Sequence, residues 1–247
     1  MERMYCSPPI AEQRSRTRAA LAVRPGERGL DIGCGIGLLS CELAREVGPS
    51  GSIVAIDASD AMVDAVRERA ANQGLKIQFD VGDAAALDYP PASFDFAAAV
   101  QVYLYVSDIE RALDSVFRVL KRGARLVIVD TDWDSCVWLT GDRERHRRII
   151  DARVREFGQP HLPPLLPGLL RRAGFELASI DAFPVVNDRY ESDSLSGGMI
   201  ETMAAIVKKF GIGAEEAQAW VDDLKARGGD GEYFFSLNRY LFLARKP

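Results

Sequence analysis

The chain has 247 residues, a formal net charge of −5, 47% hydrophobic residues and 27% charged residues. This composition is typical of a globular protein and excludes long disordered stretches, and the length predicts a single domain over residues 1–247. There is no basic stripe with interleaved aromatic residues, so nucleic acid is not an expected partner. No signal-peptide run and no apolar stretch near the roughly 20 residues of a membrane span is present, so we expect no membrane insertion.

The cysteines do not form a metal site or a disulfide pattern. Cys6, Cys34, Cys41 and Cys136 include no Cys-x-x-Cys pair, and neither histidine stands near them at ligand spacing. We therefore expect no bound metal and no disulfide framework. Reduced thiols favour a cytoplasmic location, and nothing in the sequence predicts an oligomeric state.

Helices and strands are predicted to alternate along the chain, as in a parallel sheet wound on both faces. We expect residues 1–9 to be irregular and residues 10–23 to form a helix, with residues 1–24 together acting as a flanking or lid segment. Ser59 is expected to cap a helix whose inward face includes Met62, Ala65 and Val66. The predicted strands are 29–32, 52–57, 76–81, 94–100, 125–130, 175–186 and 233–244; helices are expected at 38–47, from Ser59 to 72, after Asp108 and at 142–157 and 165–173, with two more between 194 and 227.

The second half is less regular. Residues 131–140 have no clear periodicity, four prolines between residues 159 and 167 predict a connector, and Pro184 is expected to interrupt the sixth strand. We divide the domain into a cofactor-binding core at 25–131, substrate-specific segments and a helical cap at 132–232, and a final strand within 233–247. The fold class is therefore α/β, a doubly wound and mostly parallel sheet of seven strands with an added helical cap.

Three alternate glycines join the first strand to the next helix. Gly33, Gly35 and Gly37 allow a sharp turn and the close approach of a flat ligand, while the helix start offers free N–H groups. A dinucleotide-binding loop usually reads Gly-x-Gly-x-x-Gly, but here the third place falls on Ser40. The carboxylate of Asp31 would repel an anion at this position, so the loop favours a ligand with a cationic group.

Two further acids follow strands. Asp57 stands twenty positions after Gly37, where an acid accepts hydrogen bonds from both hydroxyls of a ribose. Asp83 follows the strand at 76–81. Because the carboxyl ends of parallel strands meet at one edge of a sheet, we expect Asp31, Asp57 and Asp83 to lie in one site.

Residues 31–37 resemble the first motif of the class I S-adenosylmethionine (SAM) methyltransferases. The resemblance extends over residues 29–130 and is greatest to the branch typified by the ubiquinone and menaquinone C-methyltransferases, including residues 94–95 through the run at 118–121. That family commonly has Pro-Gly-Gly where this chain has Arg122-Gly123-Ala124, in a turn far from the expected ligand.

The resemblance implies a Rossmann-like fold, SAM as the cofactor and methyl transfer to an oxygen, nitrogen or carbon atom of a small molecule, such as a quinone-like compound or a secondary metabolite. It also implies a role for each matching residue. Asp31 and Gly33, with Gly35 and Gly37 in the same loop, would hold the methionyl end; Asp57, with Ala58 beside it, the ribose; Met62, Asp83 and Ala84 the adenine; and Gln101 would lie beside the sulfonium.

The acceptor site is less well defined. Asp132 and Trp133 follow the fifth strand and are candidates for acceptor contacts, although the tryptophans of this segment, Trp133 and Trp138, could equally serve packing alone. Candidates for catalysis or acceptor positioning are Tyr5, Tyr103 and His161, with Tyr105 as an alternative to Tyr103.

Three other functional classes remain possible from the sequence. A SAM-binding module without catalysis would have the same first half. A nicotinamide-dependent oxidoreductase would share the glycine loop and the ribose acid, but should lack Asp31 and Asp83. An arsenic methyltransferase would need a cluster of thiols, for which Cys6 and Cys136 are too few.

Overall fold

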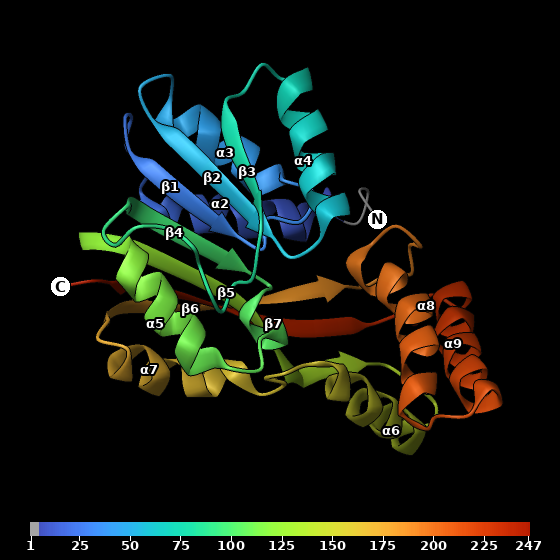
Figure 1. The fold of residues 1–247 in the computed structure, drawn as a ribbon. Coiled ribbons are helices and arrows are strands. Elements are labelled where there is room, and N and C mark those ends of the chain that lie inside the picture. Colours follow the sequence, from blue (N-terminus) through green and yellow to red (C-terminus); the bar gives the residue numbers. More distant parts are fainter. Residues whose placement is uncertain (1–4) are drawn as a thin grey trace.

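The computed structural model describes residues 5–247; residues 1–4, the first part of the expected flanking segment, lie outside the described residues. Its centre is a seven-stranded sheet with the order β3-β2-β1-β4-β5-β7-β6 (Figure 1). Strands β1 to β5 pair in parallel, whereas β7 runs antiparallel to both β5 and β6. The strands are β1 (Arg28–Ile32), β2 (Ser52–Asp57), β3 (Ile77–Val81), β4 (Phe94–Val100), β5 (Leu120–Trp138), β6 (Glu176–Asn187) and β7 (Phe235–Arg245).

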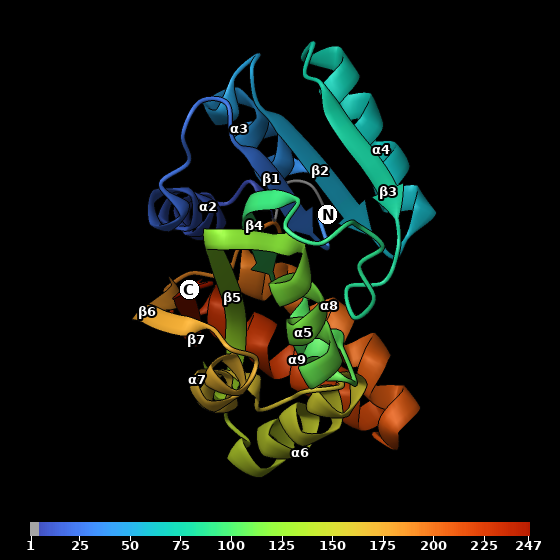
Figure 2. The same cartoon turned by 60° about the vertical axis from the view of Figure 1, so that its left-hand side comes forward.

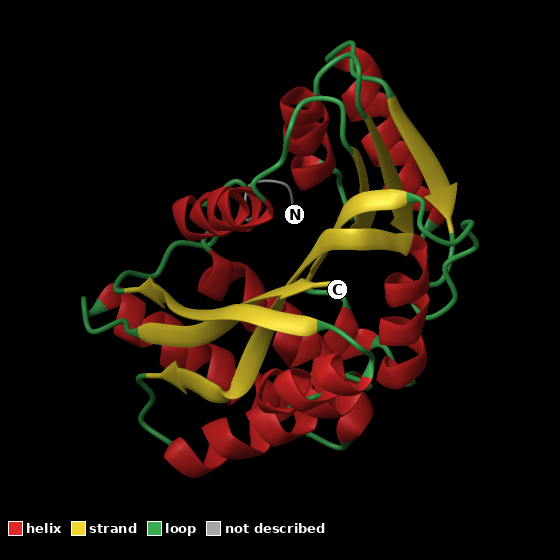
Figure 3. Cartoon of the chain, turned by 90° about the vertical axis from the view of Figure 1, so that its left-hand side faces the viewer, coloured by secondary structure: helices red, strands yellow, loops and turns green. Residues whose placement is uncertain are grey.

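Helices cover both faces of this sheet, which confirms the predicted doubly wound α/β fold (Figure 3). One buried cluster joins the sheet to α5 and α7, and another joins the opposite face to α2 and α3. The α-helices are α2 (Pro8–Leu21), α3 (Leu38–Val47), α4 (Asp60–Asn72), α5 (Ile109–Val119), α6 (Arg143–Arg153), α7 (Leu162–Arg172), α8 (Leu195–Val207) and α9 (Ala214–Gly229); short 3₁₀ helices are η1 (Tyr103–Tyr105), η2 (Val154–Glu156) and η3 (Lys208–Phe210).

Apart from these two clusters on the sheet, a second hydrophobic core holds α6, α8 and α9 against the C-terminal end of β5 and the N-terminal end of β7. Trp138 of β5 packs edge-on against Trp220 of α9, at 5.5 Å between ring centroids, and lies 4.4 Å from the ring of Phe235. The three helices gather beside one end of the sheet, as Figure 2 shows from a second side. Of the three, α8 and α9 are the two helices expected between residues 194 and 227, and their role as a cap stays a prediction.

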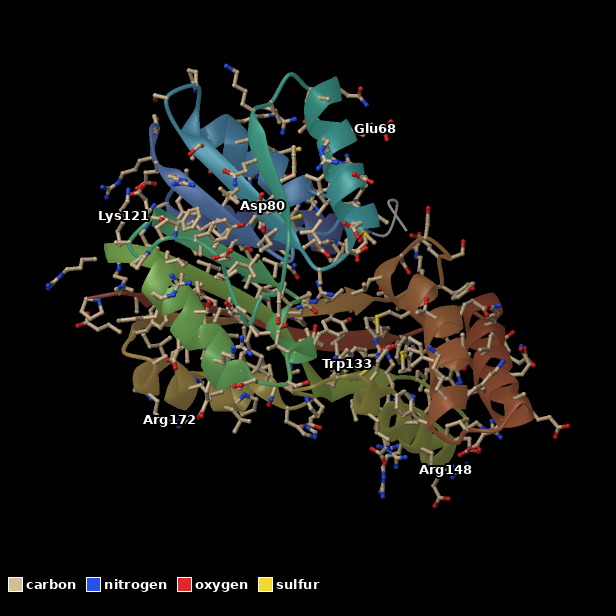
Figure 4. The ribbon with its side chains drawn as sticks, in the orientation of Figure 1. Glu68, Asp80, Lys121, Trp133, Arg148 and Arg172 are labelled. Atoms are coloured by element: carbon tan, nitrogen blue, oxygen red, sulfur yellow. The ribbon has the colours of Figure 1, made fainter. Side chains whose placement is uncertain are left out.

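The fifth strand is longer than predicted. We expected it to end at residue 130, but β5 continues to Trp138, so Lys121 and Trp133 lie toward opposite ends of it (Figure 4). The extension exists because β7 offers it a partner: Asp132 pairs with Asn238, and after a register shift Val137 pairs with Ser236. Such long-range pairing leaves no local periodicity in the sequence.

The prolines break fewer elements than predicted. The expectation of an irregular segment up to residue 9 is wrong, because α2 begins at Pro8. The proline-rich connector is partly helix: α7 begins at Leu162, with prolines in its first turn, where the missing N–H groups are not needed. Likewise β6 runs without interruption through Pro184, since it is an edge strand with one side unpaired.

The inward face of α4 also differs from the expectation. Val63, Val66 and Ala70 are its buried residues, whereas Ala65, expected inside, is exposed. Ser59 occupies the N-cap position, but its side chain makes no capping hydrogen bond.

Candidate functional site

The three glycines after β1 have different neighbours. All three have positive φ angles, +65° at Gly33, +52° at Gly35 and +74° at Gly37, so the predicted sharp turn is present. A Cβ at Gly33 would lie 2.4 Å from Val102, and one at Gly37 would lie 2.4 Å from Val66. By contrast, nothing lies within 4 Å of the Cβ position of Gly35. The loop therefore has open space beside Gly35, where a ligand can approach.

Asp31 lies beneath this loop near the end of β1. Its carboxylate is 2% exposed and accepts a hydrogen bond of 2.5 Å from the Ser40 hydroxyl, so Ser40 holds the acid that distinguishes this loop. Burial raises the pKa of Asp31 to about 7, the nearby charge of Asp57 adds to this, and Ser40 opposes it. A cation bound here would favour the ionised form.

Asp57, at the end of β2, is bonded to the glycine loop. Its Oδ2 accepts from the Gly35 N–H at 2.9 Å and its Oδ1 accepts from the Ser59 N–H at 3.0 Å. The side chain is half-buried, the adjacent Ala58 is exposed, and each carboxylate oxygen can accept a further hydrogen bond. The acid therefore fixes the loop and can still bind hydroxyl groups.

The residues expected around an adenine lie beyond β3 and on α4. Asp83 is exposed, and its Oδ1 accepts from the Ala85 N–H at 2.8 Å. Ala84 and Met62 are half-buried. Because β1, β2 and β3 are neighbours in the sheet, the structure brings Asp31, Asp57 and Asp83 to one edge.

Gln101 follows β4 in a left-handed conformation, with φ of +59°. Its N–H donates to the Val129 carbonyl at 2.8 Å, and its side-chain Oε1 accepts from the Thr131 hydroxyl at 2.6 Å. The side chain therefore lies beside the middle of β5, at the boundary between the glycine-loop half of the site and the half formed by β5 and β7.

The acceptor candidates on β5 differ in exposure. Trp133 is 7% exposed and packs against Phe157, at 5.2 Å between ring centroids, with the Arg153 guanidinium 5.1 Å from its ring. Asp132 is half-buried, and burial raises its pKa. Trp133 thus belongs to the second core, while Asp132 lies nearer its surface.

The candidate catalytic side chains differ in exposure. Tyr103 is fully buried, whereas Tyr105 is 54% exposed and Tyr5 is 39% exposed. His161 is exposed, and its Nδ1 lies 2.7 Å from a carboxylate oxygen of Asp134. Of the two tyrosines after β4, therefore, Tyr103 faces the core and Tyr105 faces outward.

Two buried polar residues in the middle of β5 and β7 were not predicted. Asp130 is fully buried and Arg239 is 6% exposed, and both carboxylate oxygens of Asp130 and the Nε of Arg239 have no hydrogen-bond partner among the described residues. A signal for Arg239 was present: it occupies an inward position in an alternating strand whose other inward residues include Leu237 and Leu241. Asp130 gave a weaker signal, as an acid that ends an apolar run.

The described residues include neither a metal-binding cluster nor a membrane-spanning helix. Within residues 5–247, no three His, Cys, Asp or Glu side chains are grouped so that they could hold a metal ion. In the same part of the chain, no helix combines the length and the apolar character that crossing a membrane requires.

Comparisons with known proteins agree with this geometry. Residues 30–123 match a family described as a methyltransferase domain. The ubiquinone/menaquinone biosynthesis C-methyltransferase UbiE of Edwardsiella ictaluri is 36% identical over 195 residues, which are 72% of this chain and 73% of that protein. The chain therefore belongs to the class I SAM-dependent methyltransferases. Within that class it resembles the UbiE branch.

Other relatives match over a smaller part of their own length. An uncharacterized 37.1 kDa protein in transposon TN4556 of Streptomyces fradiae is 33% identical over 233 residues, which are 92% of this chain and 64% of that protein. The chain spans about half the length, 46% and 43%, of the next two curated relatives, both quinone-pathway methyltransferases by name.

Solved structures share the fold. The [4+2]-cyclase SpnF superimposes with a TM-score of 0.64 at 24% identity, covering 96% of this chain and 82% of that one. Two other bacterial structures, one titled a putative methyltransferase, have TM-scores of 0.68 and 0.66 at 18% and 19% identity, also over 96% of this chain. At these identities the likeness defines the architecture, which is the Rossmann-like methyltransferase fold.

Proposed function

We propose that this protein transfers a methyl group from SAM to an oxygen, nitrogen or carbon atom of a small molecule. The observation that carries the proposal is the set of three acids on one sheet edge beside the open space at Gly35. Membership of a SAM-dependent family supports the same cofactor. In the proposal, residues 25–131 bind the cofactor, and residues 132–232 select the acceptor.

The three carboxylates and the neighbouring residues of the site fit the groups that SAM carries. Asp31 would attract the ammonium group of the methionyl end near Gly33, Asp57 would accept from the ribose hydroxyls, and Asp83 with Met62 would hold the adenine. The bound cofactor supplies an activated methyl group on a sulfonium. The chain itself then has to position the acceptor and exclude water, which is a task for the residues of β5, β7 and the cap.

Quinone-like acceptors are the first class to test, because several relatives are named for ubiquinone and menaquinone biosynthesis. No side chain has to act as a general base if the acceptor is already nucleophilic. If a base is needed, Tyr5, Tyr103 and His161 are the candidates proposed from the sequence.

A SAM-binding protein without methyl transfer is the second candidate. It is favoured by one specific observation, that a structure titled as a [4+2]-cyclase has the same fold. A nicotinamide-dependent oxidoreductase is less compatible with the site, because Asp31 stands where a dinucleotide pyrophosphate would need donors.

The two candidates differ in one assay. Protein incubated with methyl-labelled SAM and a panel of quinols, phenols, amines and aromatic acids should pass the label to at least one acceptor. The Asp57→Ala variant should not. Saturable binding of S-adenosylhomocysteine without label transfer to any acceptor would favour the binding module and contradict methyl transfer.

A further inference from the structure

Arg239 differs from the other buried arginines of residues 5–247. Arg125 is 8% exposed and pairs with both carboxylate oxygens of Glu27, at 2.8 and 2.7 Å, and Arg153 is 7% exposed and pairs with Glu156. Among the described residues, no carboxylate lies within ion-pair distance of Arg239, whereas Arg125 has Glu27. A buried cation without an anion is costly, so its retention needs a reason.

The local hydrogen bonds do not satisfy this guanidinium. Its Nη1 donates to the side-chain Oε1 of Gln13, a residue of α2 that is itself 2% exposed, while its Nε has no partner. A guanidinium has five N–H donors, and Gln13 uses one of them. The group therefore retains donors for an anion.

Asp130 does not replace the missing partner. It lies near enough to influence Arg239, but its own carboxylate oxygens are unpaired. Burial raises the pKa of Asp130 well above its usual range. The N–H groups of Leu104 and Tyr103, which approach the carboxylate without forming a hydrogen bond of good geometry, and the charge of Arg239 offset this only in part. Burial also lowers the pKa of Arg239 to about 10, so Arg239 stays charged at neutral pH.

Aromatic side chains extend from this cation toward solvent. Tyr5 and Tyr105 lie near Arg239, since both contribute to the electrostatic environment of its guanidinium. The Tyr105 ring lies edge-on to Phe157, at 5.1 Å between centroids, and Phe157 in turn contacts Trp133. Tyr105 and Tyr5 are partly exposed, so this aromatic group extends from the buried Arg239 to the surface.

The cation also lies in the half of the site that the proposed cofactor leaves free. Arg239 pairs in register with Thr131, whose hydroxyl donates to Gln101 at the end of β4. Residues paired directly across two antiparallel strands share a face, so Arg239, Thr131 and Gln101 form a continuous polar surface.

From this juxtaposition we propose that Arg239 binds a carboxylate on the methyl acceptor, and that the acceptor is an aromatic acid whose flat body lies against Tyr5 and Tyr105. This inference rests on the proposed function for the identity of the acceptor. Recognition of the acid group can nevertheless be measured without methyl transfer. A single carboxylate matches one guanidinium in charge and in geometry.

The test uses 2-naphthoate and its neutral counterpart 2-naphthamide as probes. Each is titrated by calorimetry into the wild-type chain and into Arg239→Gln, with and without saturating S-adenosylhomocysteine. We expect the wild type to bind the acid at least about tenfold more tightly than the amide, the size of one charge-assisted hydrogen bond, and the Arg239→Gln variant to bind both alike.

Arg125→Gln is the matched control, because it removes a buried arginine at the other end of the sheet and should leave the acid-to-amide ratio unchanged. Should Arg239→Gln fail to fold, Arg239→Lys keeps the charge but loses the planar fork, and its ratio should fall below that of the wild type. Equal binding of the two probes by the wild type, binding of neither, or an unchanged ratio in the Arg239 variant would overturn the proposal. Failure of S-adenosylhomocysteine to bind would instead overturn the proposed function, independently of the ratio.

Discussion

The two halves of the sheet edge satisfy their polar groups in different ways. Beside β1, β2 and β3, Asp31, Asp57 and Asp83 each accept a hydrogen bond from a side chain or an N–H group nearby. Beside β5 and β7, Asp130 and Arg239 are buried with atoms that have no partner. The first half is therefore complete as a scaffold, whereas the second has unmet hydrogen-bonding capacity that a ligand can use.

The largest expected effect compares two buried arginines by stability. Arg125→Gln should lower the free energy of unfolding by about 3 kcal/mol, because it removes the ion pair with the half-buried Glu27 carboxylate and the hydrogen bond to the Leu21 carbonyl. Arg239→Gln removes the ion-pair partner of no carboxylate and should lower the free energy of unfolding by less than about 2 kcal/mol. Urea unfolding of both variants measures the difference, and an equal loss would contradict the view that Arg239 lacks an internal partner.

Asp57→Ala should lower the affinity for S-adenosylhomocysteine by more than about 100-fold, so that binding is no longer measurable, because two hydrogen bonds to a charged group are lost. The variant also removes the acceptor for the Gly35 and Ser59 N–H groups. Circular dichroism should show an intact fold, and Asp60→Ala, an exposed acid in the first turn of α4, is the control. Unchanged affinity in the Asp57 variant would refute the ribose assignment.

The raised pKa of Asp31 predicts a pH dependence of cofactor binding. In the free protein the group binds a proton below about pH 7, and a bound ammonium group favours the ionised form. Affinity should therefore rise from about pH 5.5 to 7.5, by at most about tenfold per unit, with proton release on binding at the acid end. Calorimetry in buffers of different ionisation enthalpy detects the proton, and Asp31→Asn should show neither effect. A flat profile in the wild type would argue against Asp31 as the ammonium partner.

The Asp31 carboxyl group has the opposite effect on stability: in the ligand-free protein, its contribution to the free energy of unfolding falls as pH rises. Its pKa is raised in the folded state, so the unfolded state loses its proton first as pH rises. The contribution of Asp31 to stability is present below about pH 4 and is lost progressively up to about pH 7. Asp31→Asn should remove this loss from the stability profile of the ligand-free protein.

Asp83→Ala should weaken cofactor binding by about tenfold or less, because one contact of an exposed carboxylate is lost. The deaminated analogue S-inosylhomocysteine, which has no adenine amino group, should bind the wild type with a similar loss. The variant should show no further loss with this analogue. Additive losses would place Asp83 away from the amino group.

The smallest effect is expected at His161. Its pair with Asp134 is exposed, with side-chain exposures of 56% and 64%, so it contributes little to stability. His161→Ala should leave cofactor binding unchanged and alter methyl transfer by less than about threefold. A larger loss of turnover with normal binding would restore His161 as a catalytic base.

Local patterns explain why the first half was predictable. The boundaries of β2, α3 and β4 agree with the sequence prediction, because apolar runs, glycines and capping residues lie next to the elements they define. Asp108 likewise caps α5 as expected, accepting from the Arg111 N–H. The three acids could be placed at one edge because each follows its own strand.

The second half depended on contacts that span the chain. The extension of β5 needs β7, and the buried pair of Arg239 and Gln13 joins residues 226 positions apart. No local signal indicates such a pairing. The alternating pattern of β7 did mark Arg239 as a charged residue facing inward, which is the kind of violation that accompanies a binding site.

The most direct test of the account is a calorimetric titration of the purified protein with S-adenosylhomocysteine, alongside NAD. We predict saturable binding of S-adenosylhomocysteine, lost in Asp57→Ala, and no binding of NAD. Binding of NAD alone would contradict the assignment of Asp31 and make the protein an oxidoreductase. Binding of neither would contradict the cofactor site itself.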